Sequence, residues 1–259
     1  MKIVRTVHEW QQLQKSFQGK SLGFVPTMGA LHEGHMALVQ NSVSDNDVTV
    51  VSIFVNPTQF NNPDDLENYP STFEQDVSNL NDWKVDVLFF PEANELYPDN
   101  FAFSVDENKD SLALCGLDRP GHFKGVLTVV MKLLNIIQAT RAYFGEKDYQ
   151  QYRLIQNMVA CFFMPTEIVG VPTRRDREGL ALSSRNLRLS PEELTTARKV
   201  NKILSSETLS AEVRREKIES LGLKIDYLEE RWGRRFIAAH IGSVRIIDNV
   251  SLGEEETIK

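Results

Sequence analysis

The feature that most constrains the fold is a regular alternation of strand-like and helix-like segments over the first two thirds of the chain. Short runs rich in β-branched and aromatic residues are separated by longer runs whose apolar residues recur at helical spacing. Strands joined by helices form βαβ units, a mostly parallel sheet and right-handed crossovers. The expected strands are 21–26, 48–56, 85–91, 141–145 and 166–172, and the expected helices are 35–44, 73–83, 125–138 and 149–163.

The pattern changes near residue 175. Ser190 stands before Pro191, an N-cap followed by the proline favoured at the first helical position, and this pair predicts a helix over 191–204. A polar helical stretch follows, then strand-like runs at 223–232 and 234–249, then a frayed polar tail from residue 253. We therefore predict an α/β protein with a larger parallel-sheet domain over 1–175 and a small α+β domain over 176–259.

Composition fits an ordinary globular protein. The chain has 259 residues, of which 41% are hydrophobic and 25% charged, so disordered and fibrous classes are excluded. The formal net charge of −7 argues against a nucleic-acid-binding protein, which is normally basic. Residues 173–259 nevertheless carry 17 basic and 15 acidic side chains, against 12 and 21 before them. That enrichment fits either a solvated surface, which is commoner, or a segment that closes over an anionic ligand.

The cysteines and apolar runs bear on the compartment. Cys115 and Cys161 form no CxxC motif and no cluster with histidine, so we expect neither a zinc site nor a disulfide framework, and a reducing environment. The amino terminus lacks the apolar core of a signal peptide, and no apolar run approaches the roughly 18 residues that cross a bilayer. We expect a cytoplasmic protein without a membrane partner.

The most informative motif is VPTMGALHEGHMALV, residues 25–39, where the first of these strands gives way to a helix. Its glycines let the main chain approach a ligand, and a helix N-terminus binds phosphate through free N–H groups and its dipole. His32 and His35 lie in the first turn and can donate to phosphate oxygens where charge develops. A zinc protease would need HExxH, whereas this sequence has HEGH. We favour phosphate chemistry over zinc or two purely structural histidines.

Further polar residues follow other strands. Asn56 and Gln59 of FVNPTQF carry neutral amides suited to a hydroxyl or carboxylate substrate, although Asn-Pro is also a common turn. In FGEKDYQQ, Lys147 suits phosphate, Asp148 suits a helix cap or a ribose hydroxyl, and Gln151 lies one turn on.

Two more motifs carry polar groups before helices. LSSR at 182–185 resembles a phosphate-gripping loop, since two hydroxyls and a guanidinium follow one another. RPGHFKG holds a third histidine, His122. The LSSR segment alone fits an ordinary serine-rich turn before the next helix equally well.

The motifs are more specific together than singly, because the carboxyl ends of parallel strands meet at one sheet edge. Their combination points to a nucleotide and to transfer at phosphorus. The chain has neither GxGxxG nor GxxxxGK[ST], so a dinucleotide oxidoreductase and a P-loop enzyme are not supported.

PTMGALHEGH, VSIFVNPTQF, RPGHFKGV, FGEKDYQQ and GLALSSRN occur in this order, and together they resemble the pantothenate synthetases (pantoate–β-alanine ligases). The resemblance is close over about residues 3–200. It implies a nucleotidyltransferase with a HIGH-type motif, HEGH standing for HIGH and LSSR for the KMSKS-type loop. The implied fold is a Rossmann-like nucleotide-binding domain followed by a smaller C-terminal α+β lid domain, here shortened relative to the family.

The resemblance also implies an activity. The enzyme would use ATP, with Mg²⁺, to condense pantoate with β-alanine through pantoyl adenylate. The products would be pantothenate, which is a precursor of coenzyme A, together with AMP and pyrophosphate. The implied partners are these small molecules and a second copy of the chain in a homodimer, with no nucleic acid.

The resemblance places roles on matching residues. His35, His32 and Lys147 would be catalytic, and Gln59, Gln151 and Asn56 would bind pantoate or β-alanine. No protein ligand for Mg²⁺ is implied. Arg174 stands where the family usually has an apolar residue that touches ATP through its main chain. The implied ATP-binding residues are Met28, Gly29, Ala30, Leu31, His32, Glu33, Gly34, His35, Gly145, Glu146, Lys147, Asp148, Arg174, Leu182, Ser183, Ser184 and Arg185.

Two alternatives stay open at this point. A different nucleotidyltransferase would lack the paired Gln59 and Gln151, and a tRNA synthetase would need a further tRNA-binding domain. A non-catalytic nucleotide-binding protein would have lost His35 or Lys147, and both are present.

Overall fold

The computed structural model describes residues 1–253, so the tail expected beyond Gly253 lies outside the described residues. The chain divides into two compact units. The first comprises Met1–Glu146 and Gln150–Pro172, and the second comprises Lys147–Tyr149 and the chain from Thr173 onward. The short segment Lys147–Tyr149 thus belongs with the C-terminal part of the chain.

The first unit is built on a six-stranded sheet in the order β1-β4-β3-β2-β5-β6, with every neighbouring pair parallel. The strand order changes direction between β2 and β5, which makes their carboxyl ends a topological switch point where ligands bind in such sheets. This confirms the α/β prediction. The strands are β1 (Lys2–Val4), β2 (Leu22–Thr27), β3 (Val48–Ile53), β4 (Val87–Phe89), β5 (Arg141–Gly145) and β6 (Glu167–Val171).

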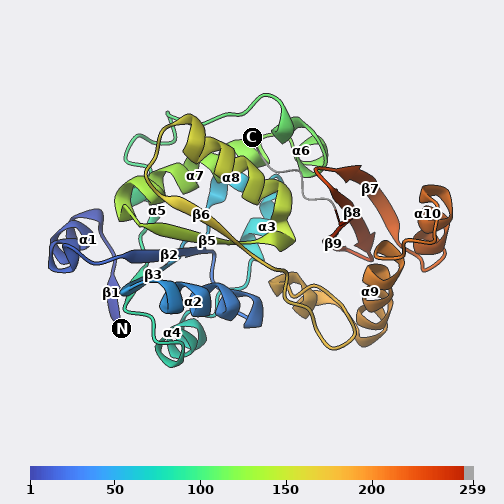
Figure 1. Ribbon diagram of the computed structural model, residues 1–259, viewed down its shortest axis with the longest axis horizontal. Coiled ribbons are helices and arrows are strands. Elements are labelled where there is room, and N and C mark those ends of the chain that lie inside the picture. The colour runs from blue at the N-terminus through green and yellow to red at the C-terminus, as the bar shows by residue number, and fades with distance from the viewer. Residues whose placement is uncertain (254–259) are drawn as a thin grey trace. The chain divides into compact units, whose positions relative to one another are not determined.

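Helices cover both faces of this sheet (Figure 1). α2 (Glu33–Asp45) and α4 (Phe73–Asp82) lie on one face, and α7 (His122–Ile137) and α8 (Tyr149–Cys161) on the other. Every residue of β3 is buried as a result, which explains its unbroken apolar sequence. The sheet core includes Val25, Val51, Leu88 and Tyr143, each fully buried.

Several short elements were not anticipated. β1 has three residues and forms by pairing with β4, which is distant in sequence. α7 begins at His122, three residues before the expected start, because Gly121 adopts a left-handed conformation that allows the chain to turn into the helix. The remaining elements are α1 (Val7–Gln14), α3 (Pro63–Glu67), α5 (Ala93–Leu96), α6 (Cys115–Asp118) and the short 3₁₀ turns η1 (Lys15–Phe17), η2 (Pro57–Gln59), η3 (Asp110–Leu112), η4 (Glu146–Asp148) and η5 (Ser184–Arg188).

The second unit holds an antiparallel sheet of β7 (Lys224–Arg231), β8 (Arg234–Ile241) and β9 (Val244–Ser251). α9 (Pro191–Leu204) begins as expected, with Ser190 and Glu193 forming a reciprocal capping box. With α10 (Ala211–Glu219) it packs on the sheet around a core that includes Ala197, Leu204, Ile218, Ile237 and Ala239 (Figure 1). The expected strand run 234–249 is in fact two strands, because the chain reverses at Gly242 with φ +56°.

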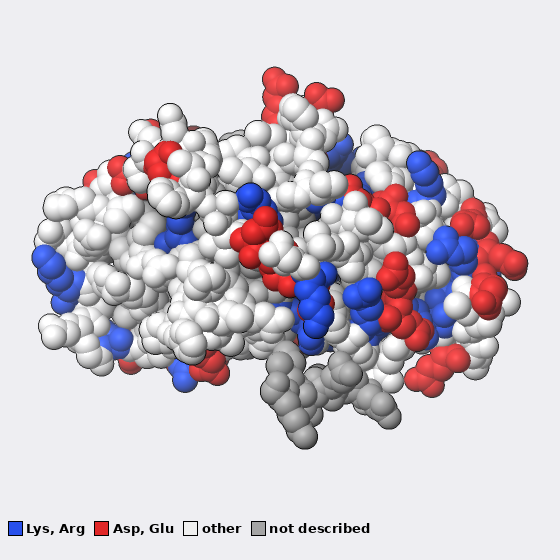
Figure 2. Space-filling view, turned by 90° about the horizontal axis from the view of Figure 1, so that it is seen from above, with Lys and Arg blue, Asp and Glu red and all other residues white. Residues whose placement is uncertain are grey.

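Charged side chains of both signs alternate over β7 and α10 (Figure 2). Much of the positive charge noted after residue 172 is paired within the second unit, as in Arg198 with Asp176 and Arg245 with Asp226, each at 2.8 Å. This favours the solvated-surface explanation for most of that charge. Among residues 1–253, no helix is long and apolar enough to span a membrane.

Candidate active site

The turn that leaves β2 is held by a buried carboxylate. Gly29 (φ +82°) and Ala30 (φ +50°) both have left-handed main-chain conformations. Asp76 of α4 is 2% exposed, and it accepts hydrogen bonds from the N–H groups of Ala30 (2.9 Å) and Leu31 (2.8 Å). A Cβ on Gly29 would lie 3.1 Å from Asp76 Oδ2, so the close approach favours glycine. Asp76 therefore determines the shape of the proposed nucleotide-binding turn.

The two histidines cap α2 reciprocally. His32 is the N-cap, and its Nδ1 accepts from the N–H of Gly34 at 3.0 Å. The Nδ1 of His35 accepts from the N–H of His32 at 3.2 Å, and the two ring centroids are 4.2 Å apart. Because each Nδ1 is an acceptor, the neutral form of each ring carries its hydrogen on Nε2. At the helix start the caps thus engage main-chain N–H groups of the first turn and leave the hydrogen of each neutral ring on Nε2, with Glu33 exposed in the same turn.

Gln59 lies against the β2 turn. Its Nε2 donates to the sulfur of Met28 at 3.2 Å, so two of the expected site segments meet. Asn56 is 1% exposed, and its Nδ2 donates to Gln59 Oε1 (3.0 Å) and to the carbonyl of Gly125 (3.1 Å). The hydroxyl of Tyr97 donates to Asn56 Oδ1 at 2.8 Å. Burial raises the pKa of Tyr97 above its ordinary value, which keeps this donor protonated. Asn56 is thus turned inward and orients the Gln59 amide.

The RPGHFKG motif holds the main chain of Gln59. Arg119 Nη2 donates to the Gln59 carbonyl (3.2 Å), and His122 Nδ1 lies 2.8 Å from the same oxygen. Arg119 Nη1 is 3.1 Å from His122 Nε2. Since arginine only donates, Nε2 is the acceptor of this pair and Nδ1–H donates to Gln59. A Cβ on Gly125 would lie 2.5 Å from the carbonyl oxygen of Thr58, so α7 and η2 pack closely only because glycine is there.

Gly145 and Gln151 also belong to the first unit. Gly145 ends β5, the neighbour of β2, and Glu146 follows it in η4. Gln151 is partly buried in the first turn of α8. The segments that follow β2, β3 and β5 therefore leave three adjacent strands at one sheet edge, as the sequence predicts for a ligand site.

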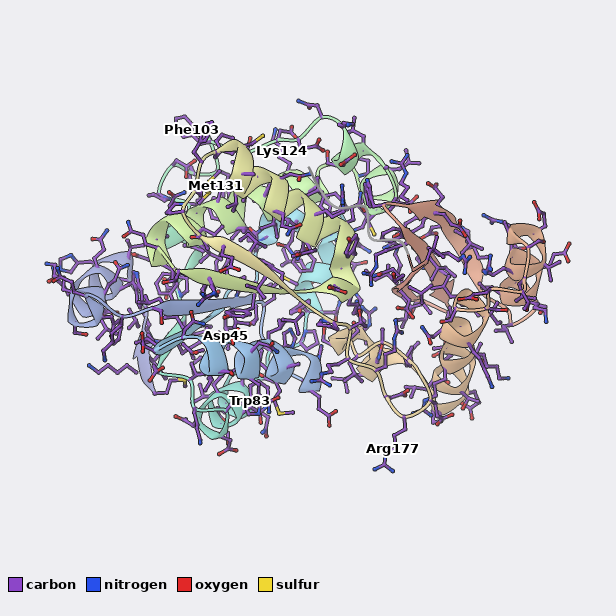
Figure 3. The ribbon with its side chains drawn as sticks, viewed as in Figure 1. Asp45, Trp83, Phe103, Lys124, Met131 and Arg177 are labelled. Atoms are coloured by element: carbon purple, nitrogen blue, oxygen red, sulfur yellow. The ribbon has the colours of Figure 1, made fainter. Side chains whose placement is uncertain are left out.

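The other expected ATP-binding residues lie in the second unit. Lys147 Nζ is 3.9 Å from Asp148 Oδ1, with 18% and 48% of the two side chains exposed. Arg174 is exposed, and its carbonyl accepts from the N–H of Leu182 at 2.9 Å. Its main chain is therefore joined by a hydrogen bond to the start of the 182–185 loop. Arg177, in the same connection, extends away from the unit into solvent (Figure 3).

The loop 182–185 contains the N-terminal cap of the short 3₁₀ turn η5. Ser183 is the N-cap of η5, and its hydroxyl accepts from the N–H of Arg185 at 3.3 Å. Ser184 is buried, while Leu182 and Arg185 are partly exposed. The loop therefore has a defined conformation of its own within the second unit.

Comparison with known proteins identifies the family. The sequence model of the family described as pantoate-beta-alanine ligase matches residues 2–251. The chain belongs to this family. It is 50% identical over 250 residues to the pantothenate synthetase of Bdellovibrio bacteriovorus, with 96% of this chain and 99% of that protein covered. It is 49% identical to that of Legionella pneumophila (strain Lens), covering 97% and 100%.

Solved structures agree with these sequence relatives. The pantoate-beta-alanine ligase of Francisella tularensis, complexed with beta-gamma ATP and beta-alanine, superposes with a TM-score of 0.93 at 43% identity, covering 99% of this chain and 100% of that chain. The pantothenate synthetase of Thermus thermophilus gives 0.88 at 38% identity, covering 97% and 99%. Both solved chains are covered almost completely, so the similarity extends over both units of this chain.

Sequence reasoning missed Asp76, Tyr97 and Arg119. A signal for Asp76 was available, because helical spacing places this charge on the face formed by Phe73, Val77 and Leu80. A carboxylate on an apolar helix face requires buried partners. Tyr97 and Arg119 gave no such signal, since their partners depend on the packing of distant segments.

Proposed function

We propose that this ligase joins pantoate to β-alanine at the expense of ATP, through pantoyl adenylate, releasing AMP and pyrophosphate. The observation that carries the proposal is the reciprocal cap formed by the Nδ1 atoms of His32 and His35 at the start of α2, beside the switch point of the sheet. Family membership and the ATP complex of the Francisella relative support it. The proposed partners are therefore small-molecule substrates, with no nucleic acid.

In the first step a pantoate carboxylate oxygen attacks the α-phosphorus and pyrophosphate leaves. Negative charge grows on the phosphoryl oxygens, and donors already oriented toward it lower the barrier. His32 and His35 would supply such donors at the α2 N-terminus, where the helix dipole also favours negative charge. Lys147 would neutralise phosphate charge, while residues 182–185 would grip the phosphates and the main chain of Arg174 would contact the nucleotide. Catalysis here is positioning and charge stabilisation.

Pantoate binding falls to neutral amides. Gln59 is held on both its side chain and its carbonyl, so its amide is oriented before substrate arrives. Gln151 would supply the second amide. Asn56 serves this site by fixing Gln59, since its own amide is buried and engaged with protein groups. In the second step the β-alanine amine attacks the acyl carbon and AMP departs with the bonding electron pair.

Magnesium belongs to this proposal only through the substrate. Among the described residues, no three His, Cys, Asp or Glu side chains gather as a metal site. Mg²⁺ commonly keeps its waters and binds through nucleotide phosphates. We assign Mg²⁺ no protein ligand in this proposal. By family resemblance we also propose that the ligase is a cytoplasmic homodimer.

The decisive experiment is radiolabelled pyrophosphate–ATP exchange with pantoate present and β-alanine absent. Exchange under these conditions, followed by chase to pantothenate and AMP on adding β-alanine, is the expected result. Gln59→Ala and Gln151→Ala should raise the pantoate KM more than the ATP KM. Formation of ADP, or an absolute need for β-alanine before exchange, would contradict an adenylate mechanism.

A further inference from the structure

Strand β9 carries two buried polar residues that the proposed reaction does not use. Asp248 is 7% exposed and Asn249 is 2% exposed. Successive residues of a strand point to opposite faces, so both faces of β9 are covered at this place. Buried polar groups are costly unless they are hydrogen-bonded, so the partners of these two side chains show what they organise.

Asn249 holds the segment that contains Lys147. Its Nδ2 donates to the carbonyl oxygen of Lys147 at 3.0 Å, across 102 residues of sequence. Its Oδ1 accepts from Arg234 Nε at 2.6 Å. The Arg234 guanidinium in turn lies 4.3 Å from the ring centroid of Tyr149, a cation–π distance. β8 and β9 therefore secure this segment at a main-chain carbonyl and at a ring two residues later.

Asp248 holds the base of the 182–185 loop. Its carboxylate accepts two hydrogen bonds from the Arg175 guanidinium, at 2.7 and 2.8 Å, which is the strong bidentate arrangement. Asn201 of α9 donates to the same carboxylate at 3.2 Å. Arg175 forms a β-bridge with Ala181, immediately before the loop begins. A shift of Arg175 would thus be passed to Leu182 and its neighbours.

We propose that Asp248 and Asn249 are positioning residues for ATP, acting through Arg175 and through Lys147. This rests on the proposed function, in which Lys147 and residues 182–185 contact ATP. Neither side chain needs to touch the nucleotide. Because Asp248 and Asn249 are adjacent in one strand, they fix the position of the Lys147 segment relative to the base of the 182–185 loop. The Lys147 ammonium can then move only through its own side-chain torsions.

The test for Asn249 is a double-mutant cycle with Lys147. Asn249→Asp keeps the size of the side chain and the acceptor for Arg234 but loses the donor to the Lys147 carbonyl. We expect it to lower kcat/KM for ATP about 10-fold in pyrophosphate exchange, the scale of one lost hydrogen bond, with the pantoate KM unchanged. In a Lys147→Ala background the same change should have little further effect, because the group it positions is gone.

The matched control is Asp226→Asn on β7 of the same sheet. Asp226 accepts from Arg245 at 2.8 Å and lies 3.3 Å from His240 Nε2, so these partners belong to β8 and β9 and not to the proposed ATP segments. It should leave exchange unchanged in both backgrounds. An equal loss from Asn249→Asp with and without Lys147 would show a merely structural role and overturn the proposal. Should Asn249→Asp melt below the assay temperature, Asn249→Ser, too short to reach the carbonyl, takes its place in the cycle.

Asp248 is tested by Asp248→Asn and Arg175→Lys, which both lose the bidentate pair. Each should raise the ATP KM while leaving the pantoate KM unchanged, and unchanged ATP dependence in both would overturn this half. Calorimetric binding of a non-hydrolysable ATP analogue separates the two hypotheses. One outcome would be that wild type binds the analogue, that the variants bind it more weakly, and that wild type gives no exchange. In that case the proposed function is wrong, but the positioning roles of Asp248 and Asn249 are supported. If wild type and all variants give normal exchange, the positioning roles are wrong and the proposed function is unaffected.

Discussion

The histidine turn of the first unit and the proposed ATP segments of the second unit are stabilised over very different distances along the chain. His32 and His35 are oriented by hydrogen bonds that span two or three residues. Arg175 and Lys147 depend on partners 73 and 102 residues away, in β9. Short-range bonds form whenever α2 forms, whereas long-range bonds require the whole second unit. Chemistry-bearing residues can thus be specified locally in one half of a protein and globally in the other.

The largest expected effect tests the local half. His35→Ala removes one oriented donor and one capping acceptor, and it should slow pantoate-dependent exchange by about 10²–10³. Circular dichroism should show an unchanged fold, because the sheet does not depend on this side chain. His8→Ala, an exposed histidine on α1, is the control and should exchange normally. A His35→Ala enzyme retaining more than half of wild-type turnover would remove His35 from the mechanism.

The second prediction probes a long-range support of the histidine turn, the Asp76 carboxylate. Asp76→Asn leaves an amide where two main-chain N–H groups now meet a carboxylate. Unfolding in urea should show a loss of about 1–3 kcal/mol, and the ATP KM should rise because the turn loosens. Asp82→Asn, exposed at the end of the same helix, should change neither. If Asp76→Asn were as stable as wild type and had a normal ATP KM, the conformation of the turn would depend on neighbouring residues alone, like the cap of α2.

The third prediction concerns the substrate amide. Tyr97→Phe removes the hydroxyl that donates to Asn56 and should cost about 0.5–1.5 kcal/mol of orientation at Gln59. Steady-state kinetics should show the pantoate KM rising several-fold while the ATP KM stays constant. If the ATP KM changed instead, Gln59 would contact the nucleotide and not pantoate.

The smallest effect is a pH dependence in the second unit. Burial tends to raise the pKa of Asp176, but hydrogen bonds from Arg198 and from the N–H groups of Leu180 and Glu178 outweigh it, so the pKa lies below its ordinary value. Stability from this carboxylate is present above the unfolded pKa of about 4 and is lost as pH falls through the folded value. Thermal melts from pH 6 to pH 3 should show a shallower decline for Asp176→Asn. If the melting temperatures of wild type and Asp176→Asn fell in parallel with pH, the ionised Asp176 carboxylate would contribute nothing to the stability of the second unit.

The strands and helices flanking the site could be predicted because their signals are local. β3 and α2 are read from uninterrupted apolar residues and from helical spacing, and α9 from its cap. A capping box at Thr6 and Glu9 announces α1 in the same way and was overlooked. β1 offered no usable signal, since three residues become a strand only by pairing with β4.

By itself the sequence determined the α/β order of elements, the glycine-rich turn with its two histidines, and the motifs that place the chain among the pantoate–β-alanine ligases. Tertiary structure alone decided that Asn56 faces inward, that Asp76 holds the turn, and that Asp248 and Asn249 reach Arg175 and Lys147. The physical reason is range. Spacing and capping depend on neighbours within one or two turns, whereas the partner of a buried polar group is set by which distant segment the fold brings within about 3 Å.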